Sequence, residues 1–200
     1  MKFISTRDIK GDTKVSPAFA IKQGLAPDGG LYTPRAVPQI NPAELIDADF
    51  KAMAKKILIT SLIELSYPEK AEKILSLFLD DFSSEELLEY ANAAYANGNF
   101  PAEVAPLTSL SNDLSVLELW HGPTAAFKDF ALCIMPHLLT ASLRKLGETR
   151  TAMILVATSG DTGKAALEGF KDVENTQIIV FYPENGVSAM QKHQMNLLSP

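Results

Sequence analysis

The chain has 200 residues, of which 46% are hydrophobic and 21% charged, and its formal net charge at pH 7 is −6. This length and apolar content suffice for one or two globular domains. The acidic balance and the lack of a basic run argue against a nucleic-acid partner. Charged residues break the apolar stretches within about 18 residues, which argues against a membrane span. Residues 1–8 carry no long apolar core, so we do not expect them to be a secretory signal.

A short strand is predicted at residues 2–8, close to the start of the chain. Ser16 and Pro17 then suit the N-cap and the first position of a helix that ends near Gly24. A turn at residues 28–30 follows, and it leads into a short extended segment.

The spacing of apolar residues from 42 to 97 is typical of helices. One predicted helix starts at Asp49 and ends at Tyr67, because the residue before a proline is disfavoured in the helical conformation. A shorter helix follows at residues 69–79.

Ser83 and Glu86 have the spacing of a capping box, so a further helix is predicted to start there. It stops near Gly98, after which the pattern changes. We therefore predict a mostly helical N-terminal domain at residues 1–97 and a second domain at residues 98–200.

The second domain alternates strands with helices. In chain order we predict a strand at 115–120, a helix at 130–146 closed by Gly147, a strand at 151–157, a helix to about 170, a strand at 177–182 and a helix from 188. This order predicts an α/β domain with a parallel sheet. Because the strands at 151–157 and 177–182 are almost continuously apolar, we expect both faces of the sheet to be buried.

Lys128 is the first candidate for chemistry, because it lies where a loop after a strand becomes a helix. Ligands of open α/β sheets bind at such places. A cation is unfavourable at a helix N-terminus, and Phe127, Phe130 and Ala131 offer an apolar setting that would lower the pKa of the amine. A deprotonated lysine can form a Schiff base with an aldehyde cofactor. The ordinary alternative is a solvated surface lysine.

The second candidate is the loop at residues 159–163, which ends one strand and opens the next helix. Free backbone N–H groups at a helix start bind carboxylates and phosphates, and Ser159 and Thr162 add hydroxyl donors. Gly160 and Gly163 permit a close backbone approach. The loop is neither a Walker A loop nor a dinucleotide fingerprint. The alternative is an ordinary N-cap at Ser159 or Asp161.

The histidines and the cysteine carry weaker signals. His121 can donate to a phosphate group, although a lone histidine is more often structural. No histidines stand at metal-ligand spacing, so we predict no metal site. Cys133 is the only cysteine, which rules out an intrachain disulfide. We interpret it as a small buried hydrophobe in a protein of the reducing cytoplasm.

Four segments of the sequence resemble the threonine synthase family. The most specific are HGPTAAFKDFA at residues 121–131 and ATSGDTG at residues 157–163, and they occur in the expected order. Residues 24–32 and 183–195 resemble the same family. The resemblance therefore touches most of the chain.

The resemblance implies a pyridoxal-phosphate-dependent enzyme with a three-layer parallel-sheet fold. It would convert O-phospho-L-homoserine and water to L-threonine and phosphate. In that family the lysine of the FKD segment carries the cofactor, which implicates Lys128 in both binding and catalysis. The other implied cofactor contacts are Phe127, Asp129, Ser159, Gly160, Asp161, Thr162 and Gly163, and the implied substrate contacts are His121, Thr124, Ser159 and Thr162. Lys164 stands where many members carry a small residue, and we expect its side chain to point outward.

The family continues for roughly as long again after the point that corresponds to residue 200. The loop that cups the cofactor phosphate and the residue that faces the pyridine nitrogen are not found in these residues. We therefore expect an incomplete fold that alone binds the cofactor weakly and is inactive, from a protein that is a monomer or a homodimer. Two alternatives stay open, which are another pyridoxal phosphate enzyme such as an amino-acid dehydratase, and a catalytically silent fragment.

Overall fold

The computed structural model describes residues 2–35, 81–96, 98–158 and 160–198. The two helices predicted at residues 49–67 and 69–79 lie outside these ranges. Within the described part, no helix is both long and apolar enough to cross a membrane.

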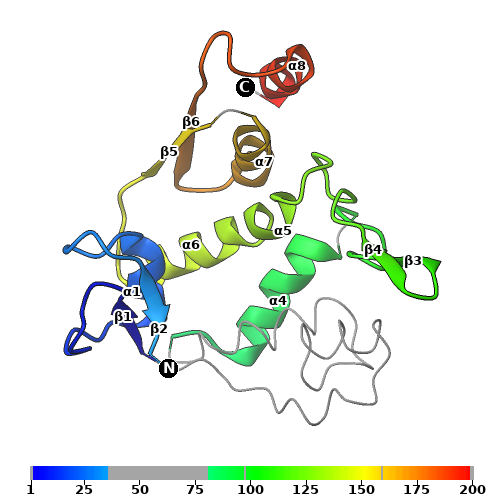
Figure 1. Ribbon diagram of the computed structural model, residues 1–200. Helices are drawn as coiled ribbons and strands as arrows, with labels where there is room; N and C mark the ends of the chain where they lie inside the picture. The colour runs from blue at the N-terminus through cyan, green and yellow to red at the C-terminus, as the bar shows by residue number, and fades with distance from the viewer. Residues whose placement is uncertain (1, 36–80, 97, 159, 199–200) are drawn as a thin grey trace.

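The N-terminal segment folds as two short strands around a helix. β1 (Phe3–Ser5) pairs antiparallel with β2 (Tyr32–Pro34), and α1 (Pro17–Gln23) lies between them in the chain. The predicted start of α1 is confirmed, because the side chain of Ser16 accepts a hydrogen bond from the Phe19 N–H at 3.3 Å. α1 packs against α6, which places this segment beside one end of the central helix (Figure 1).

The capping box predicted at Ser83 and Glu86 is also confirmed. It opens α4 (Ser84–Tyr95), where the Ser83 hydroxyl accepts from the Glu86 N–H and the Glu86 carboxylate accepts from the Ser83 N–H. The Glu86 carboxylate also pairs with Lys145 of α6 at 2.7 Å, which ties the start of α4 to the end of that helix.

The strand predicted at residues 115–120 belongs to a separate hairpin rather than to the parallel sheet. β3 (Leu107–Ser111) and β4 (Leu114–Leu117) form an antiparallel pair of their own. β3 was not predicted, because its pairing with β4 depends on a two-residue connection without a strong hairpin signal. The hairpin projects from the molecule on the side away from β1 and β2 (Figure 1).

The long helix predicted at residues 130–146 is broken into two. α5 (Asp129–Leu132) is followed by α6 (Met135–Lys145), with Pro136 at the start of α6. Proline has no N–H to donate to the preceding turn, and its ring collides with the carbonyl four residues earlier, so the helix restarts there. Gly147 ends α6 with φ +66° as predicted, and its N–H bonds the Arg144 carbonyl at 3.1 Å.

The predicted alternation of strand and helix is confirmed in the C-terminal part. β5 (Ala152–Ala157), α7 (Asp161–Phe170) and β6 (Thr176–Phe181) form a parallel βαβ unit, followed by α8 (Ala189–Leu198). The two strands run in register from the pair Ala152 and Thr176 to the pair Ala157 and Phe181.

The prediction that both faces of this sheet are buried is wrong for the described residues. Ile154 and Ile178 pack on Phe170 and its neighbours from α6 and α7, so one face is covered. Side chains on the other face are exposed, as for Leu155 (64% exposed) and Phe181 (58% exposed). The described sheet has two strands with α7 on one side of them (Figure 1), and nothing in the described residues covers the other side.

The main core lies where α4, α5 and α6 meet. Leu87 and Ala91 of α4 are fully buried and pack with Phe82, Ile134 and Leu138. The Tyr95 hydroxyl donates to the Phe130 carbonyl at 2.6 Å, so the polar end of this buried ring is satisfied. This core joins residues on both sides of position 97, and the division into domains there stays a prediction.

We expect Leu87→Ala to lower the free energy of unfolding by about 2–5 kcal/mol, because Leu87 is fully buried and its truncation leaves a cavity in the core. Urea denaturation of the two proteins measures the difference. Leu114→Ala is the matched control, since Leu114 is exposed on the hairpin and should cost far less. Equal losses in the two variants would contradict this description of the core.

Candidate functional site

The segment from His121 to Asp129 links the hairpin to α5 through two tight turns. The Ala125 N–H donates to the Gly122 carbonyl and the Asp129 N–H to the Ala126 carbonyl, each at 3.0 Å. Ala125 has φ +55°, in the left-handed region that is unfavourable for residues other than glycine. The conformation of this loop therefore needs support from outside its own backbone.

The side chain of Asp129 supplies that support. Its carboxylate accepts hydrogen bonds from the Thr124 N–H at 2.9 Å, the Thr124 hydroxyl at 2.6 Å and the Ala126 N–H at 3.4 Å. Only 1% of Asp129 is exposed, and all these partners come from the loop that precedes it. Asp129 therefore holds the loop closed at the position next to Lys128.

Lys128 stands at the N-cap of α5 and is half-buried. Its Nζ lies 4.6 Å from the centre of the Phe127 ring, which is within the range of a cation–π contact. Phe127 is 54% exposed, while Phe130 packs on Phe100 in the core. Lys128 is therefore only partly buried and lies beside one aromatic ring, and α5 has four residues rather than the long helix that the sequence predicted.

In the loop after β5, Thr158 and Gly160 belong to the described residues, whereas Ser159 between them does not. Gly160 is the N-cap of α7 and no side chain caps this helix. The ordinary alternative of a side-chain cap at Asp161 is therefore wrong. The Thr158 hydroxyl accepts from the Gly160 N–H at 3.1 Å. The first N–H groups of α7 point out of the helix, where they can meet an anion.

The glycines of this loop are also required by packing, which the sequence analysis did not predict. A Cβ on Gly163 would lie 2.5 Å from Thr158 Cγ2 and 2.9 Å from Val180 Cγ1. A Cβ on Gly160 would collide with the Gln191 side chain of α8 at 2.4 Å. Gln191 also donates to Asp161 Oδ1 at 3.1 Å, so α8 holds the start of α7 in place.

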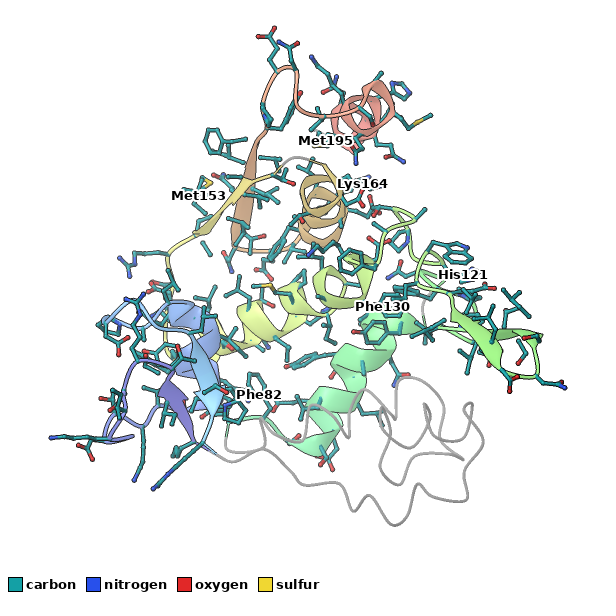
Figure 2. All side chains as sticks on the ribbon, viewed as in Figure 1. Phe82, His121, Phe130, Met153, Lys164 and Met195 are labelled. Atoms are coloured by element: carbon teal, nitrogen blue, oxygen red, sulfur yellow. The ribbon has the colours of Figure 1, made fainter. Side chains whose placement is uncertain are left out.

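Lys164 does not point outward as predicted. It is 6% exposed, and its Nζ lies 3.4 Å from Asp161 Oδ1 within the first turn of α7. Figure 2 labels it on α7. The lysine charge beside the candidate anion loop is therefore offset by a neighbouring carboxylate.

His121 follows the hairpin and lies at the hairpin end of the loop, away from α5 (Figure 2). Its Nε2 is 2.6 Å from Glu118 Oε2, and its ring lies against Trp120 with 5.6 Å between the ring centres. Hydrogen bonds from Thr108 and from His121 hold the pKa of Glu118 below its usual range. Since Glu118 engages Nε2, Nδ1 is the atom with which His121 can meet a ligand.

Contacting helices carry the two candidate loops. A Cβ on Gly169 of α7 would lie 2.2 Å from the Leu132 carbonyl oxygen of α5, so the two helices touch without an intervening side chain. Lys128 begins the first of these helices and Gly160 caps the second. The described residues hold no group of histidine, cysteine and acidic side chains fit for a metal ion.

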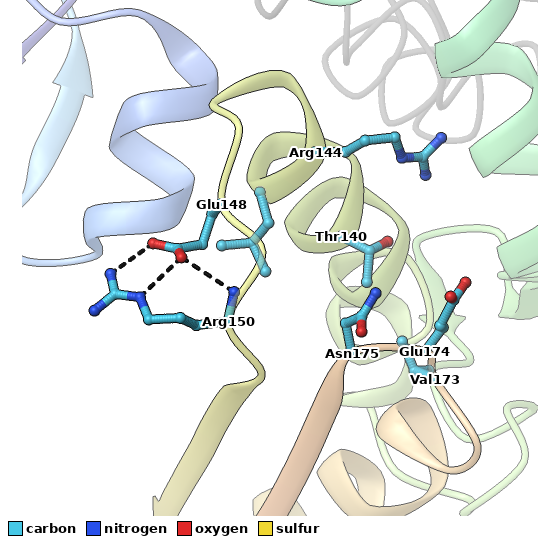
Figure 3. Close-up of a pocket in the computed structure, with 8 residues that line it drawn as sticks. Thr140, Arg144, Glu148, Arg150, Val173, Glu174 and Asn175 are labelled. Atoms are coloured by element: carbon cyan, nitrogen blue, oxygen red, sulfur yellow. Dashed lines mark hydrogen bonds and ion pairs between the residues drawn. The ribbon is translucent and has the colours of Figure 1, made fainter.

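A cavity of about 520 Å³ lies elsewhere, at the amino ends of β5 and β6 (Figure 3). Its lining residues are Thr140, Leu143, Arg144, Glu148, Arg150, Val173, Glu174 and Asn175. Arg150 donates to both oxygens of Glu148 at 2.8 and 2.7 Å, and these bonds keep the pKa of Glu148 far below its usual range. Ligands of parallel sheets bind at the carboxyl ends of strands, so this cavity is not the predicted site.

Burial raises the pKa of the Cys133 thiol to about 12, with the charges of Asp129 and Glu168 as further causes. We expect iodoacetamide at pH 8 to leave Cys133 unmodified in the folded protein, because only the thiolate reacts. Mass spectrometry of the alkylated protein measures this. The same treatment in 8 M urea is the control and should give complete labelling. Fast labelling of the folded protein would mean that the thiol is accessible.

Comparison with known proteins places the chain among similar sequences. The profile of the family described as "Threonine synthase N terminus" matches residues 2–62. The chain is 37% identical over 206 residues to the threonine synthase of Pseudomonas aeruginosa, which covers 99% of this chain and 38% of that protein. It is 36% identical over 207 residues to human threonine synthase-like 1, covering 96% of this chain and 26% of that protein.

Solved structures agree with the sequences. A pyridoxal-phosphate-bound threonine synthase from Brucella melitensis matches with a TM-score of 0.78 and 34% identity, over 98% of this chain and 38% of that one. The yeast threonine synthase matches with a TM-score of 0.79 and 31% identity, over 97% and 38%. The predicted resemblance and the α/β fold class are thus confirmed. The chain spans about two fifths of the length of these threonine synthases.

Proposed function

We propose that this chain is the N-terminal portion of a threonine synthase and that Lys128 is the residue to which pyridoxal phosphate attaches. The observation that carries the proposal is the loop from His121 to Lys128, which is folded around the Asp129 carboxylate and presents an amine at the start of α5. The names of the relatives favour this reaction over that of an amino-acid dehydratase.

The described residues fit the cofactor in two respects. The Lys128 amine is half-buried beside Phe127, so it is reachable by an aldehyde. The uncapped start of α7 lies on a helix in contact with α5, and its N–H groups suit a carboxylate or a phosphate. When bound, pyridoxal phosphate supplies an electron sink for chemistry at the carbons of an amino acid.

The proposed reaction converts O-phospho-L-homoserine and water to L-threonine and phosphate. Phosphate leaves from Cγ and water adds at Cβ, so protons must move at neighbouring carbons. Lys128 is the base and acid proposed for these transfers, since its amine is the proposed attachment point itself. Thr162 and the first N–H groups of α7 hold the substrate carboxylate. His121, fixed by Glu118 at Nε2, donates to the substrate phosphate through Nδ1 in its imidazolium form, in which both ring nitrogens carry a proton.

Thr124 receives a modified role in this proposal. Its hydroxyl donates to Asp129 at 2.6 Å and its side chain is buried, so it supports the loop and can meet the substrate only as a hydrogen-bond acceptor. The enzyme is proposed to act in the cytoplasm on this small-molecule substrate, as a monomer or homodimer.

Lys128 should carry the cofactor. We expect that incubation with pyridoxal phosphate, borohydride reduction and peptide mapping label Lys128, and that Lys128→Ala loses almost all of this label. Lys145 is a built-in control, because its amine is paired with Glu86. Label on Lys145 or on the buried Lys164 in place of Lys128 would overturn the assignment.

Thr162 should act on the substrate rather than on the cofactor. In the whole protein we expect Thr162→Val to lower kcat/KM for O-phospho-L-homoserine by about 10-fold to 100-fold, the usual range for loss of one buried hydrogen bond to a charged group. The absorbance of the bound cofactor should stay unchanged. Thr140→Val is the matched control, since Thr140 lines the cavity at the other end of the sheet. Loss of cofactor with normal turnover per bound cofactor would contradict this role.

A further inference from the structure

We propose that Asp129 is a positioning residue, which sets the direction of the Lys128 amine by geometry and does not touch cofactor or substrate. The proposal rests on the function proposed above in one respect, namely that pyridoxal phosphate is the group that attaches to Lys128. Its basis is the set of contacts between the Asp129 carboxylate and the loop that ends at Lys128.

The carboxylate closes the loop by accepting from both ends of a turn. Oδ1 takes the Thr124 hydroxyl, and Oδ2 takes the N–H groups of Thr124 and Ala126. In return the Asp129 N–H donates to the Ala126 carbonyl at 3.0 Å. Lys128 lies between these two anchored points, so its backbone has little freedom to rotate.

The loop gives two signs that it needs this anchor. Ala125 adopts φ +55°, which costs free energy for a residue with a Cβ. Gly122 is packed so closely against Asp129 that a Cβ would lie 2.5 Å from both Cβ and Oδ2 of that side chain. Contacts that short do not occur, so only glycine at position 122 lets the carboxylate reach its donors.

The burial of Asp129 excludes direct contact with a ligand. The side chain is 1% exposed and both of its oxygens are occupied by donors from the loop. On the other side of Lys128, its carbonyl accepts from the Leu132 N–H at 3.0 Å in the first turn of α5. Hydrogen bonds on both sides of Lys128 therefore fix its backbone, and this sets the direction in which its side chain leaves the backbone.

Two substitutions of Asp129 can separate the effect of its hydrogen bonds from the effect of its negative charge. In Asp129→Asn the amide oxygen can take the place of Oδ2 and accept from the two N–H groups, while the amide NH₂ donates to the Thr124 oxygen, whose hydroxyl can rotate. The loop therefore keeps its hydrogen bonds without the negative charge. Asp129→Ala removes every one of these bonds.

The experiment measures the rate at which pyridoxal phosphate and borohydride label Lys128 in the protein, together with hydrogen exchange at the amides of Thr124 and Ala126. We expect Asp129→Ala to slow labelling by about tenfold or more, because small displacements of a reacting group have large kinetic effects, and to speed exchange at both amides. Asp129→Asn should restore labelling to within about threefold of the parent protein. Asp113→Ala, on the exposed hairpin turn, should change neither measurement.

Specific results would overturn the proposal. If Asp129→Asn slows labelling as much as Asp129→Ala, the charge matters and not the geometry. If Asp129→Ala labels at the parent rate, Asp129 does not position the amine. Failure of the parent protein to label Lys128 would sink the proposed function, while amide exchange would still report on the loop.

A milder variant covers the case in which Asp129→Ala does not fold. Thr124→Val removes only the hydroxyl donor and leaves both N–H bonds to Oδ2. We expect a smaller loss of labelling rate that becomes larger when Thr124→Val is combined with Asp129→Asn, since the amide NH₂ then faces a methyl group. A purely additive combination would show that the two side chains do not act as one support.

Discussion

A buried carboxylate that faces its own loop is the constraint on which the candidate site depends. Asp129 accepts from Thr124 and Ala126, and this arrangement compensates for an unfavourable φ at Ala125. A charged group out of water is stable only when hydrogen bonds replace the lost hydration, and the loop supplies them. The same contacts place Lys128 at the first turn of α5. Loop conformation and lysine position are therefore set by one interaction.

Local signals explain how much of this fold was predictable. Ser16 with Pro17, Ser83 with Glu86, and Gly147 act through hydrogen bonds to residues within four positions, and the structure confirms all of them. The βαβ unit after residue 151 was predictable because its strands and helix differ in apolar period. The prediction of one long helix at 130–146 was wrong because Pro136 was treated as one more apolar residue. Proline has no N–H for the helical hydrogen bond, so the helix is broken there.

The site was predictable as a list of residues but not as a set of contacts. The motif around Lys128 identified the amine. The hydrogen bonds of Asp129 to Thr124 and Ala126 could not be predicted, because they depend on the geometry of a turn and not on the spacing of the residues. Gly160 and Gly163 were predicted to let a ligand approach the backbone closely. In the structure, Gln191 and Val180 lie so near to these glycines that neither position has room for a Cβ. The two interpretations are compatible, because no side chain caps the first N–H groups of α7 with a hydrogen bond.

Charge pairing separates Lys128 from three other lysines of the described part of the chain. Lys145 is paired with Glu86, Lys22 with Glu148, and the buried Lys164 with Asp161. Each of these pairs ties the amine to a carboxylate within ion-pair distance. Among the described residues no carboxylate lies within ion-pair distance of Lys128. Its amine instead lies over the Phe127 ring. A cation–π contact leaves the amine nitrogen reachable from one side, whereas an ion pair would have to be broken before a carbonyl could be attacked. The nearest carboxylate in the sequence, Asp129, turns away into its loop, so the same hydrogen bonds that shape the loop also leave Lys128 available for chemistry.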